Sequence, residues 1–260
     1  MTPTDIRRHM TYTSAIGKLR GAILFIHGMW SNAEAWKFWT PVFVNNGYDV
    51  WTINLSSRTG KTSILNYVKQ AQEAIDWIEN WHEITPILIG HSMGGLISQR
   101  VAAERTIPKL ILLGSAGPSG ICNIHWPLLW NLKGYLLSII LRKLFQPNYA
   151  ALYPLVLHRF DSDTRIEIMK EIFPDSGQAA WEIICSSIKV DKLLGDCKTL
   201  VVAGCYDQIM PLPIQKAIAK KYKCQYIVAP HGHMMMLENN SKATLEHILN
   251  WLNQNTGLND

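Results

Sequence analysis

Six short apolar segments, each bounded by turn-forming residues, constrain the fold of this chain more than any other feature. Their hydrophobicity is continuous, which indicates strands buried on both faces, as in a parallel sheet covered by helices. The segments are 21–27, 48–53, 85–90, 108–114, 198–204 and 224–229. Between them, residues such as Ile64, Val68 and Ile75 form apolar stripes with helical spacing. Near the C-terminus, Ser241 is a suitable N-cap for a final helix. This alternation predicts an α/β fold with a doubly wound, mostly parallel sheet.

The alternation of strands and helices stops after Gly117 and resumes near Cys197. The residues between them show helical periodicity, and we expect helices at 126–145, 162–173 and 175–189. The economical interpretation is a helical cap inserted into an α/β core, with the cap at 118–195 and the core at 1–117 and 196–260. The first of these helices is apolar on most sides, so one face is expected to line a pocket for an apolar ligand. Burial against the sheet or a partner chain explains the same pattern equally well.

Composition excludes several classes of protein. Of the 260 residues, 48% are hydrophobic and 17% are charged, which argues for a large buried core and against a disordered chain or a coiled coil. Lysine and arginine number 25 against 20 aspartates and glutamates, and the basic residues are scattered. We therefore expect no nucleic-acid partner.

The cysteines and the apolar segments bear on the cellular setting. Five cysteines without a C-x-x-C pair provide neither a disulfide framework nor a thiolate metal site, which favours a reducing, cytoplasmic location. The N-terminal 21 residues lack the apolar stretch of a signal peptide. Residues 110–132 carry no charge, but glycines and prolines interrupt them, so we expect a buried strand and a loop and no integral membrane span. Gly60-Lys61-Thr62 resembles the end of a P-loop, yet Leu55 stands where that motif requires glycine.

The segment Gly90-His91-Ser92-Met93-Gly94 carries the strongest chemical signal. It follows a predicted strand and precedes a predicted helix, which is the context that a G-x-S-x-G nucleophile turn requires. Glycine two residues before and after the serine removes side chains that would collide with the neighbouring strand and helix. Free N–H groups at the start of the helix can face a developing negative charge. We expect Ser92 to be a nucleophile.

A serine hydroxyl is a weak nucleophile at neutral pH, so it needs a base and a group that orients the base. Asp207 follows the segment at 198–204, and His233 follows the segment at 224–229. Both therefore lie on loops past the carboxyl ends of strands, where sheet-built sites collect. The order serine, aspartate, histidine is the order expected for such a triad.

These features together resemble the α/β-hydrolase superfamily across essentially the whole chain. The resemblance includes His27-Gly28-Met29-Trp30 after an early strand, the turn at Ser92, the cap, Asp207, and a Gly-His pair before the final helix. It implies that Ser92 is the nucleophile, His233 the general base and then acid, and Asp207 the orienting carboxylate. It also implies an oxyanion hole formed by the backbone N–H groups of Met29 and Met93.

Other positions follow from the same resemblance. Expected supports of the nucleophile turn and the oxyanion loop are His27, Gly28, Gly90, His91 and Gly94. Candidate pocket residues are Trp30, Trp126, Trp130 and Met234. His231 could compete with His233, but His233 directly follows glycine and precedes the final helix. The two histidines have no carboxylate or cysteine at ligand spacing, so we expect no metal site. Residues 54–60 depart from the Pro-Gly-His-Gly-type turn of much of the family, which leaves the subfamily open.

The serine excludes the epoxide hydrolases and haloalkane dehalogenases, which use aspartate at this position. We expect a serine hydrolase that acts on carboxylic esters of small lipophilic molecules, without a cofactor, as a monomer or homodimer. Thioesterase, lactonase and lysophospholipase activities remain open. Hydroxynitrile-lyase-like, perhydrolase-like and C–C hydrolase activities would use the same triad. A receptor built on a hydrolase fold is the alternative from a different class, although a binding protein needs no complete triad.

Overall fold

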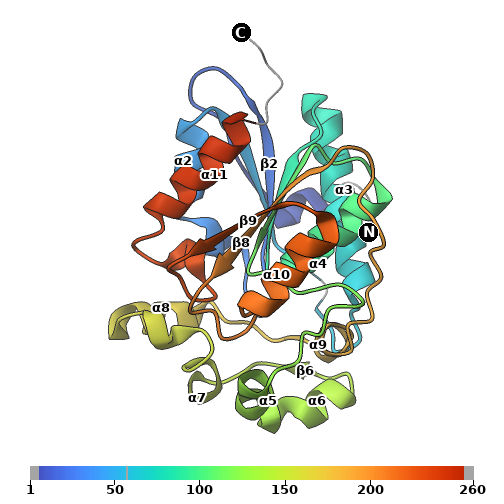
Figure 1. Cartoon of the computed structure of the whole chain (residues 1–260), viewed down its shortest axis with the longest axis vertical. Coiled ribbons are helices and arrows are strands. Elements are labelled where there is room, and N and C mark those ends of the chain that lie inside the picture. Colours follow the sequence, from blue (N-terminus) through green and yellow to red (C-terminus); the bar gives the residue numbers. More distant parts are fainter. Residues whose placement is uncertain (1–5, 57, 255–260) are drawn as a thin grey trace.

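A seven-stranded sheet forms the centre of the computed structural model, which describes residues 6–56 and 58–254 (Figure 1). The strands are β1 (Met10–Thr13), β2 (Gly21–Ile26), β3 (Tyr48–Ile53), β4 (Ile87–His91), β5 (Lys109–Leu113), β8 (Lys198–Gly204) and β9 (Gln225–Ala229). Their order in the sheet is β1-β3-β2-β4-β5-β8-β9. The pair β1 and β3 is antiparallel, and the other neighbours are parallel. The predicted α/β fold with a mostly parallel sheet is therefore confirmed.

All six predicted strands are present, with ends within two residues of those expected. The sequence pattern did not reveal β1, because this edge strand is mostly exposed and carries no apolar run. The central strands are buried along their whole length: all residues of β3, β4 and β5 are buried. Continuous hydrophobicity marks strands that are covered on both faces, and an exposed edge strand needs none.

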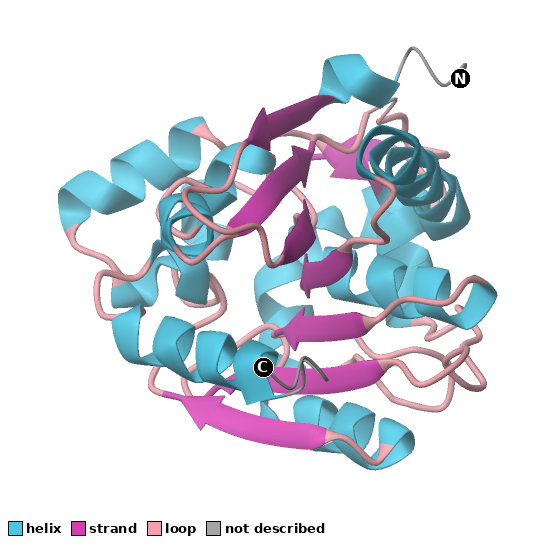
Figure 2. Ribbon diagram, turned by 90° about the horizontal axis from the view of Figure 1, so that it is seen from above, coloured by secondary structure: helices cyan, strands magenta, loops and turns pink. Residues whose placement is uncertain are grey.

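Helices cover both faces of the sheet (Figures 1 and 2). On one face lie α2 (Thr40–Asn45) and α11 (Lys242–Gln254), and on the other lie α3 (Ile64–His82), α4 (Met93–Glu104) and α10 (Leu212–Tyr222). The apolar stripe of α3 is buried as its spacing predicts, except at its last member, Trp81, which is 56% exposed. Ser63 caps this helix by accepting a hydrogen bond from the Asn66 N–H. Short 3₁₀ helices are η1 (Arg7–His9), η2 (Ala33–Trp36) and η5 (Met235–Leu237).

The segment between β5 and β8 lies beyond the carboxyl ends of the central strands, at the lower end of the molecule in Figure 1. Its elements are α5 (Trp126–Leu132), η3 (Lys133–Tyr135), α6 (Leu136–Ile140), β6 (Leu144–Phe145), α7 (Tyr149–Leu152), η4 (Leu157–Arg159), α8 (Ser162–Lys170), β7 (Asp175–Ser176) and α9 (Gly177–Ile184). The strands β6 and β7 pair as a short antiparallel ribbon. Where the cap begins and ends as a domain stays a prediction.

One continuous helix over 126–145 was the wrong expectation. The segment instead breaks into α5, η3 and α6, and Arg142 adopts a left-handed conformation (φ 53°) before β6. Leu128 and Ile139 line the same cavity, whereas a straight helix would separate them by about 16 Å along its axis. The helix predicted at 162–173 is shorter, and the one at 175–189 starts after Ser176 and ends before Ser186, which is left-handed (φ 47°). Within the described residues, no helix combines the length and hydrophobicity needed to cross a membrane.

Candidate active site

Ser92 lies at the sharp turn between β4 and α4. Its backbone is left-handed, with φ 54° and ψ −119°, a conformation that costs a residue other than glycine about 1–3 kcal/mol. Surrounding hydrogen bonds impose this conformation. The Ser92 N–H donates to the carbonyl of Leu113 (3.0 Å), and the Ser92 carbonyl accepts from the N–H of Ala116 (3.1 Å). The turn is therefore held by the neighbouring strand β5 and the loop that follows it.

The glycines around Ser92 permit close backbone contacts. A Cβ on Gly94 would collide with the carbonyl oxygen of Ile26, at the end of β2. A Cβ on Gly90 would lie 2.5 Å from the carbonyl oxygen of Gly94, and one on Gly28 would lie 3.0 Å from the Ser92 Cβ. Such contacts are too short for real side chains, so glycine lets the early loop at Gly28 pack directly against the serine.

Asp207 and His233 form a buried hydrogen-bonded pair. His233 Nδ1 lies 2.9 Å from Asp207 Oδ2, while Asp207 Oδ1 accepts from the N–H groups of Ile209 and Met210, both at 2.8 Å. Burial alone would raise the pKa of Asp207, but His233 and the two backbone donors outweigh it and hold this pKa below its usual value. The carboxylate is ionised and accepts from Nδ1–H, so the unprotonated nitrogen of the neutral His233 ring is Nε2.

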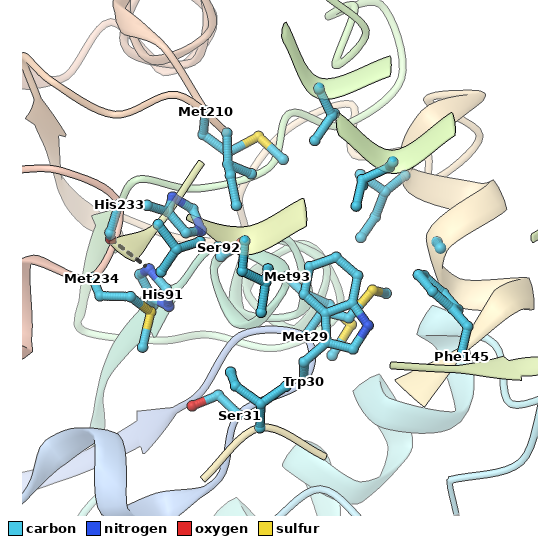
Figure 3. Close-up of a pocket in the computed structure, with 18 of the residues that line it drawn as sticks. Met29, Trp30, Ser31, His91, Ser92, Met93, Phe145, Met210, His233 and Met234 are labelled. Atoms are coloured by element: carbon cyan, nitrogen blue, oxygen red, sulfur yellow. Dashed lines mark hydrogen bonds between the residues drawn. The ribbon is translucent and has the colours of Figure 1, made fainter. Parts of the chain in front are cut away.

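His27 and His91 are buried histidines that contact the two loops of the site. His27 Nε2 accepts from the N–H of Leu55 (3.1 Å), and its Nδ1 therefore donates to the Gly28 carbonyl (2.8 Å). His91 Nε2 donates to the carbonyl of His233 (2.9 Å; Figure 3). Burial lowers the pKa of each to about 3, assisted by Arg58 for His27 and by His233 for His91. Both rings are neutral at physiological pH.

Ser92 and His233 open onto the same apolar cavity, together with Met29, Trp30 and Met234 (Figure 3). The cavity and its mouth hold about 740 Å³ that protein atoms do not occupy. Its far walls come from the segment between β5 and β8, with Leu128, Leu132, Ile139, Phe145, Ile183 and Ile184. The sequence pattern did not single out these positions individually. The all-round apolar character of residues 126–145 pointed to the first four, and no signal pointed to Ile183 and Ile184.

Trp126 and Trp130 do not line the cavity, which corrects their expected role. Trp126 is 70% exposed and Trp130 is 54% exposed, and their rings stack on one another with centroids 5.8 Å apart. The reason is the phase of α5. Leu128 and Leu132 occupy the side of this helix that faces the cavity, so residues two positions away lie on its outer side.

Met29 and Met93, the predicted oxyanion-hole residues, both line the cavity. Neither backbone N–H donates a hydrogen bond to another group in the described part of the chain. The next N–H, that of Trp30, donates to Asp175 Oδ2 (3.1 Å). Asp175 is completely buried and lies in β7, far along the chain from this loop. No sequence motif marks Asp175, because its importance comes from a contact between distant segments.

His231 contributes to the fold around the site and not to the cavity. Its Nδ1 lies 3.1 Å from Glu238 Oε2, and its Nε2 lies 2.9 Å from Thr244 Oγ1. Glu238 also accepts from the N–H of Gly232 (2.6 Å), so these contacts hold the loop that carries His233. Among residues 6–56 and 58–254, no group of three or more histidine, cysteine, aspartate or glutamate side chains could hold a metal ion.

The chain is similar to known proteins in sequence and in structure. The chain is 30% identical over 120 residues to the uncharacterized hydrolase YugF of Bacillus subtilis, a match that spans 42% of this chain and 44% of that protein. A soluble variant of monoglyceride lipase from Saccharomyces cerevisiae, solved with a substrate analog, is similar in structure, with a TM-score of 0.78 and 16% identity over 95% of this chain and 91% of that one. The monoacylglycerol lipase of Paleococcus ferrophilus is also similar in structure, with a TM-score of 0.71 and 16% identity over 95% of this chain and 99% of that one.

At such low identities the two lipase structures establish a shared fold. The alpha/beta hydrolase family model, in addition, matches residues 23–246, which include most of β2, the turn at Ser92, Asp207 and His233. The chain therefore belongs to the alpha/beta hydrolase family.

Proposed function

We propose that the protein is a serine hydrolase that cleaves carboxylic esters of lipophilic substrates through an acyl-enzyme. Ser92 is the nucleophile, His233 the general base and acid, and Asp207 the group that orients His233. One observation carries the proposal: the strained turn at Ser92 and the ring of His233, hydrogen-bonded to Asp207, meet at one apolar cavity. A binding protein would not need this combination of strain, buried carboxylate and oriented imidazole.

Acylation begins when Ser92 Oγ attacks the ester carbonyl carbon and His233 Nε2 takes the hydroxyl proton. The carbonyl oxygen becomes an oxyanion, which the free N–H groups of Met29 and Met93 stabilise. Asp207 keeps the proton of the ring on Nδ1 and stabilises the imidazolium. His233 then gives its proton to the departing alkoxide, and the C–O bond breaks to leave an acyl group on Ser92.

Deacylation repeats the same steps with water as the nucleophile. His233 removes a proton from water, the hydroxide adds to the acyl carbon, and the oxyanion forms again beside Met29 and Met93. Collapse of this intermediate releases the carboxylic acid and returns the proton to Ser92. The low pKa of His91 keeps this ring neutral, so it places no positive charge next to His233, whose ring centre lies 4.6 Å away.

The cavity walls support a lipophilic acyl or alkyl group. Apart from Ser31, Ser92 and the two histidines, the side chains that line it are apolar. An apolar chain gains free energy by leaving water for such walls, whereas a charged or strongly hydrated group would lose its hydration without compensation. The shared fold with monoglyceride lipases is consistent with this substrate class.

Initial rates on p-nitrophenyl esters from acetate to palmitate, measured with wild type and Ser92→Ala in parallel, test the proposal. We expect ester hydrolysis by the wild type and a loss of about 10⁴-fold or more in kcat for the variant. A fluorophosphonate probe should label the wild type and leave the variant unlabelled.

If the wild type hydrolyses none of the esters but is labelled by the fluorophosphonate, Ser92 is activated and the proposed class of ester is wrong. Thioesters, lactones, lysophospholipids and lyase substrates would then be assayed. A wild type that neither turns over nor labels would contradict the proposal and favour a receptor role.

A further inference from the structure

Five large apolar side chains are exposed on α5, on α6 and at the residue that follows α6, and none of them lines the cavity. This outer face consists of Trp126, Trp130, Leu137, Ile140 and Leu141. Trp126 and Leu137 are 70% and 67% exposed, and the other three side chains are just over half exposed. An apolar cluster of this kind on a folded protein marks an interaction surface.

The helices α5 and α6 are apolar on two opposite sides for two different reasons. Leu128, Leu132 and Ile139 face inward and line the cavity. The outer face, by contrast, serves no part of the described fold. In Figure 1 the two helices lie at the lower end of the molecule, beyond the sheet.

The charge around the outer face has one sign. Between Arg105 and Phe160 the chain contains no aspartate or glutamate. Lys133 and Lys143 are exposed there, and the Lys133 ammonium lies 3.6 Å from the centre of the Trp130 ring. The helix α9, which packs on α6, carries a single carboxylate, Glu182, and it is occupied by hydrogen bonds from Ile64 N–H and Gln178.

We propose that the outer face docks on the surface of a lipid bilayer that contains anionic lipids. Tryptophan is the side chain that most favours the boundary between headgroups and acyl chains, and neighbouring lysines are attracted by anionic headgroups. A second copy of the chain fits this face less well. A symmetric dimer would bring each patch against itself and would set lysines against lysines without a compensating carboxylate.

Docking explains how lipophilic esters reach the enzyme, and in this respect it rests on the proposed function. The inner and outer faces belong to the same short helices, so a docked molecule holds the wall of its cavity against the lipid. The binding itself needs no catalysis, and Ser92→Ala should bind lipid as the wild type does.

Vesicle sedimentation tests the docking, with vesicles of phosphatidylcholine and of an equal mixture of phosphatidylcholine and phosphatidylserine. The variants are Trp126→Ser, Trp126→Ser with Trp130→Ser, and Lys133→Gln with Lys143→Gln. Trp81→Ser is the matched control, because Trp81 is 56% exposed and stacks on Trp77 at 5.0 Å but lies in the last turn of α3. Circular dichroism and hydrolysis of p-nitrophenyl acetate check that each variant is folded.

We expect the wild type to bind the mixed vesicles, and the double tryptophan variant to bind them at least about tenfold more weakly. The affinity of the lysine variant should fall by about tenfold or more for the mixed vesicles and only a little for vesicles of phosphatidylcholine alone. Trp81→Ser should bind like the wild type.

The proposal is overturned if the wild type binds neither kind of vesicle, or if Trp81→Ser weakens binding as much as Trp126→Ser. It is also overturned if the wild type is a dimer that the tryptophan variants convert to a monomer. Vesicle binding without ester hydrolysis would refute the proposed function alone.

Discussion

The nucleophile turn depends on residues that have no side chain. Gly94 lies in the first turn of α4, and the carbonyl oxygens of Ile26 and His27 occupy the space in which its Cβ would stand. These oxygens belong to backbone and cannot turn away as a flexible side chain would. The strained conformation of Ser92 therefore persists because β2 and α4 approach each other this closely.

Gly94→Ala should destabilise the protein by about 2–3 kcal/mol, since the new methyl group forces β2 and α4 apart. Gly134→Ala is the matched control, because no atom lies within 4 Å of a Cβ there and its φ is not left-handed. That change should be neutral or stabilising by about 0.5 kcal/mol. Urea unfolding at neutral pH measures both, and equal effects would contradict the packing argument.

The two buried histidines make stability depend on pH. The pKa of His27 and of His91 is lowered to about 3 from 6.5, so between these values the unfolded chain binds protons that the folded chain does not. Stability is then lost as the pH falls below 6.5, by about 1.4 kcal/mol per pH unit for each histidine. The low pKa of Asp207 acts in the same direction at lower pH, since the folded state favours its ionised form.

His91→Gln tests this pH dependence, because its amide can keep the donor to the His233 carbonyl but cannot titrate. We expect the free energy of unfolding to fall less steeply below pH 6 in the variant than in the wild type, by about 1.4 kcal/mol per pH unit. Urea unfolding at a series of pH values gives both slopes. An unchanged slope would show that His91 is not the titrating group.

At the scale of elements, a buried carboxylate joins the ribbon β6–β7 to the loop that follows β2. Asp175 Oδ2 accepts from the N–H of Trp30, and Oδ1 accepts from Tyr67 OH and from the Ser176 N–H, both at 2.7 Å. Trp30 is left-handed (φ 61°) and directly follows Met29. The position of the Met29 N–H thus depends on a residue from the other side of the cavity.

Asp175→Asn should lower kcat by about 10- to 100-fold with little change in KM. If the amide oxygen keeps the Tyr67 bond, its NH₂ group meets the Trp30 N–H, two donors repel, and the loop with Met29 shifts. Tyr67→Phe removes one bond of the same carboxylate but leaves the Trp30 bond, so its kcat should stay near that of the wild type. Steady-state kinetics on a p-nitrophenyl ester compares them, and equal losses would point to a general effect on folding.

At the scale of the whole molecule, the cavity lies between the sheet and the helices of the segment at 118–195. Neither part encloses it alone, since Ser92, Met29 and His233 come from the sheet side and residues such as Ile183 from the other. We therefore expect the segment between β5 and β8 to influence the choice of substrate. The chemistry proposed for Ser92 belongs to the loops at the ends of the strands.

Ile183→Trp should shorten the preferred acyl chain, because the indole fills part of the cavity. We expect the ratio of kcat/KM for octanoate over acetate to fall by about tenfold or more, with acetate hydrolysis retained. Ile166→Trp is the control, since Ile166 is 56% exposed on α8 and does not line the cavity. The p-nitrophenyl ester series measures the ratios. A parallel decline for both esters would mean that the variant damages the site itself.

Local patterns predicted six of the seven strands of the sheet and supplied the candidates for the proposed triad. Strands β2, β3, β4, β5 and β8 can be recognised because burial on both faces demands an unbroken apolar run. The edge strand β9 has an apolar run too, although only Ala229 of its residues is buried, so the expectation that its segment is covered on both faces was wrong. Ser92, Asp207 and His233 can be located because each follows a strand directly, and parallel strands bring their carboxyl ends to one edge. The edge strand β1 carries no apolar run that would reveal it, because most of its residues face water.

The sequence by itself determined the family, six of the seven strands of the sheet and the order of the proposed catalytic residues, because these follow from local spacing. Tertiary structure alone decided which side of α5 faces the cavity, and so placed Leu128 inside and Trp126 outside. It also decided that Asp175 binds the loop at Trp30. An all-round apolar helix has no phase that periodicity can detect, and a contact between distant residues leaves no local pattern. The orientation of α5 and the contact of Asp175 can therefore be read only from the folded structure.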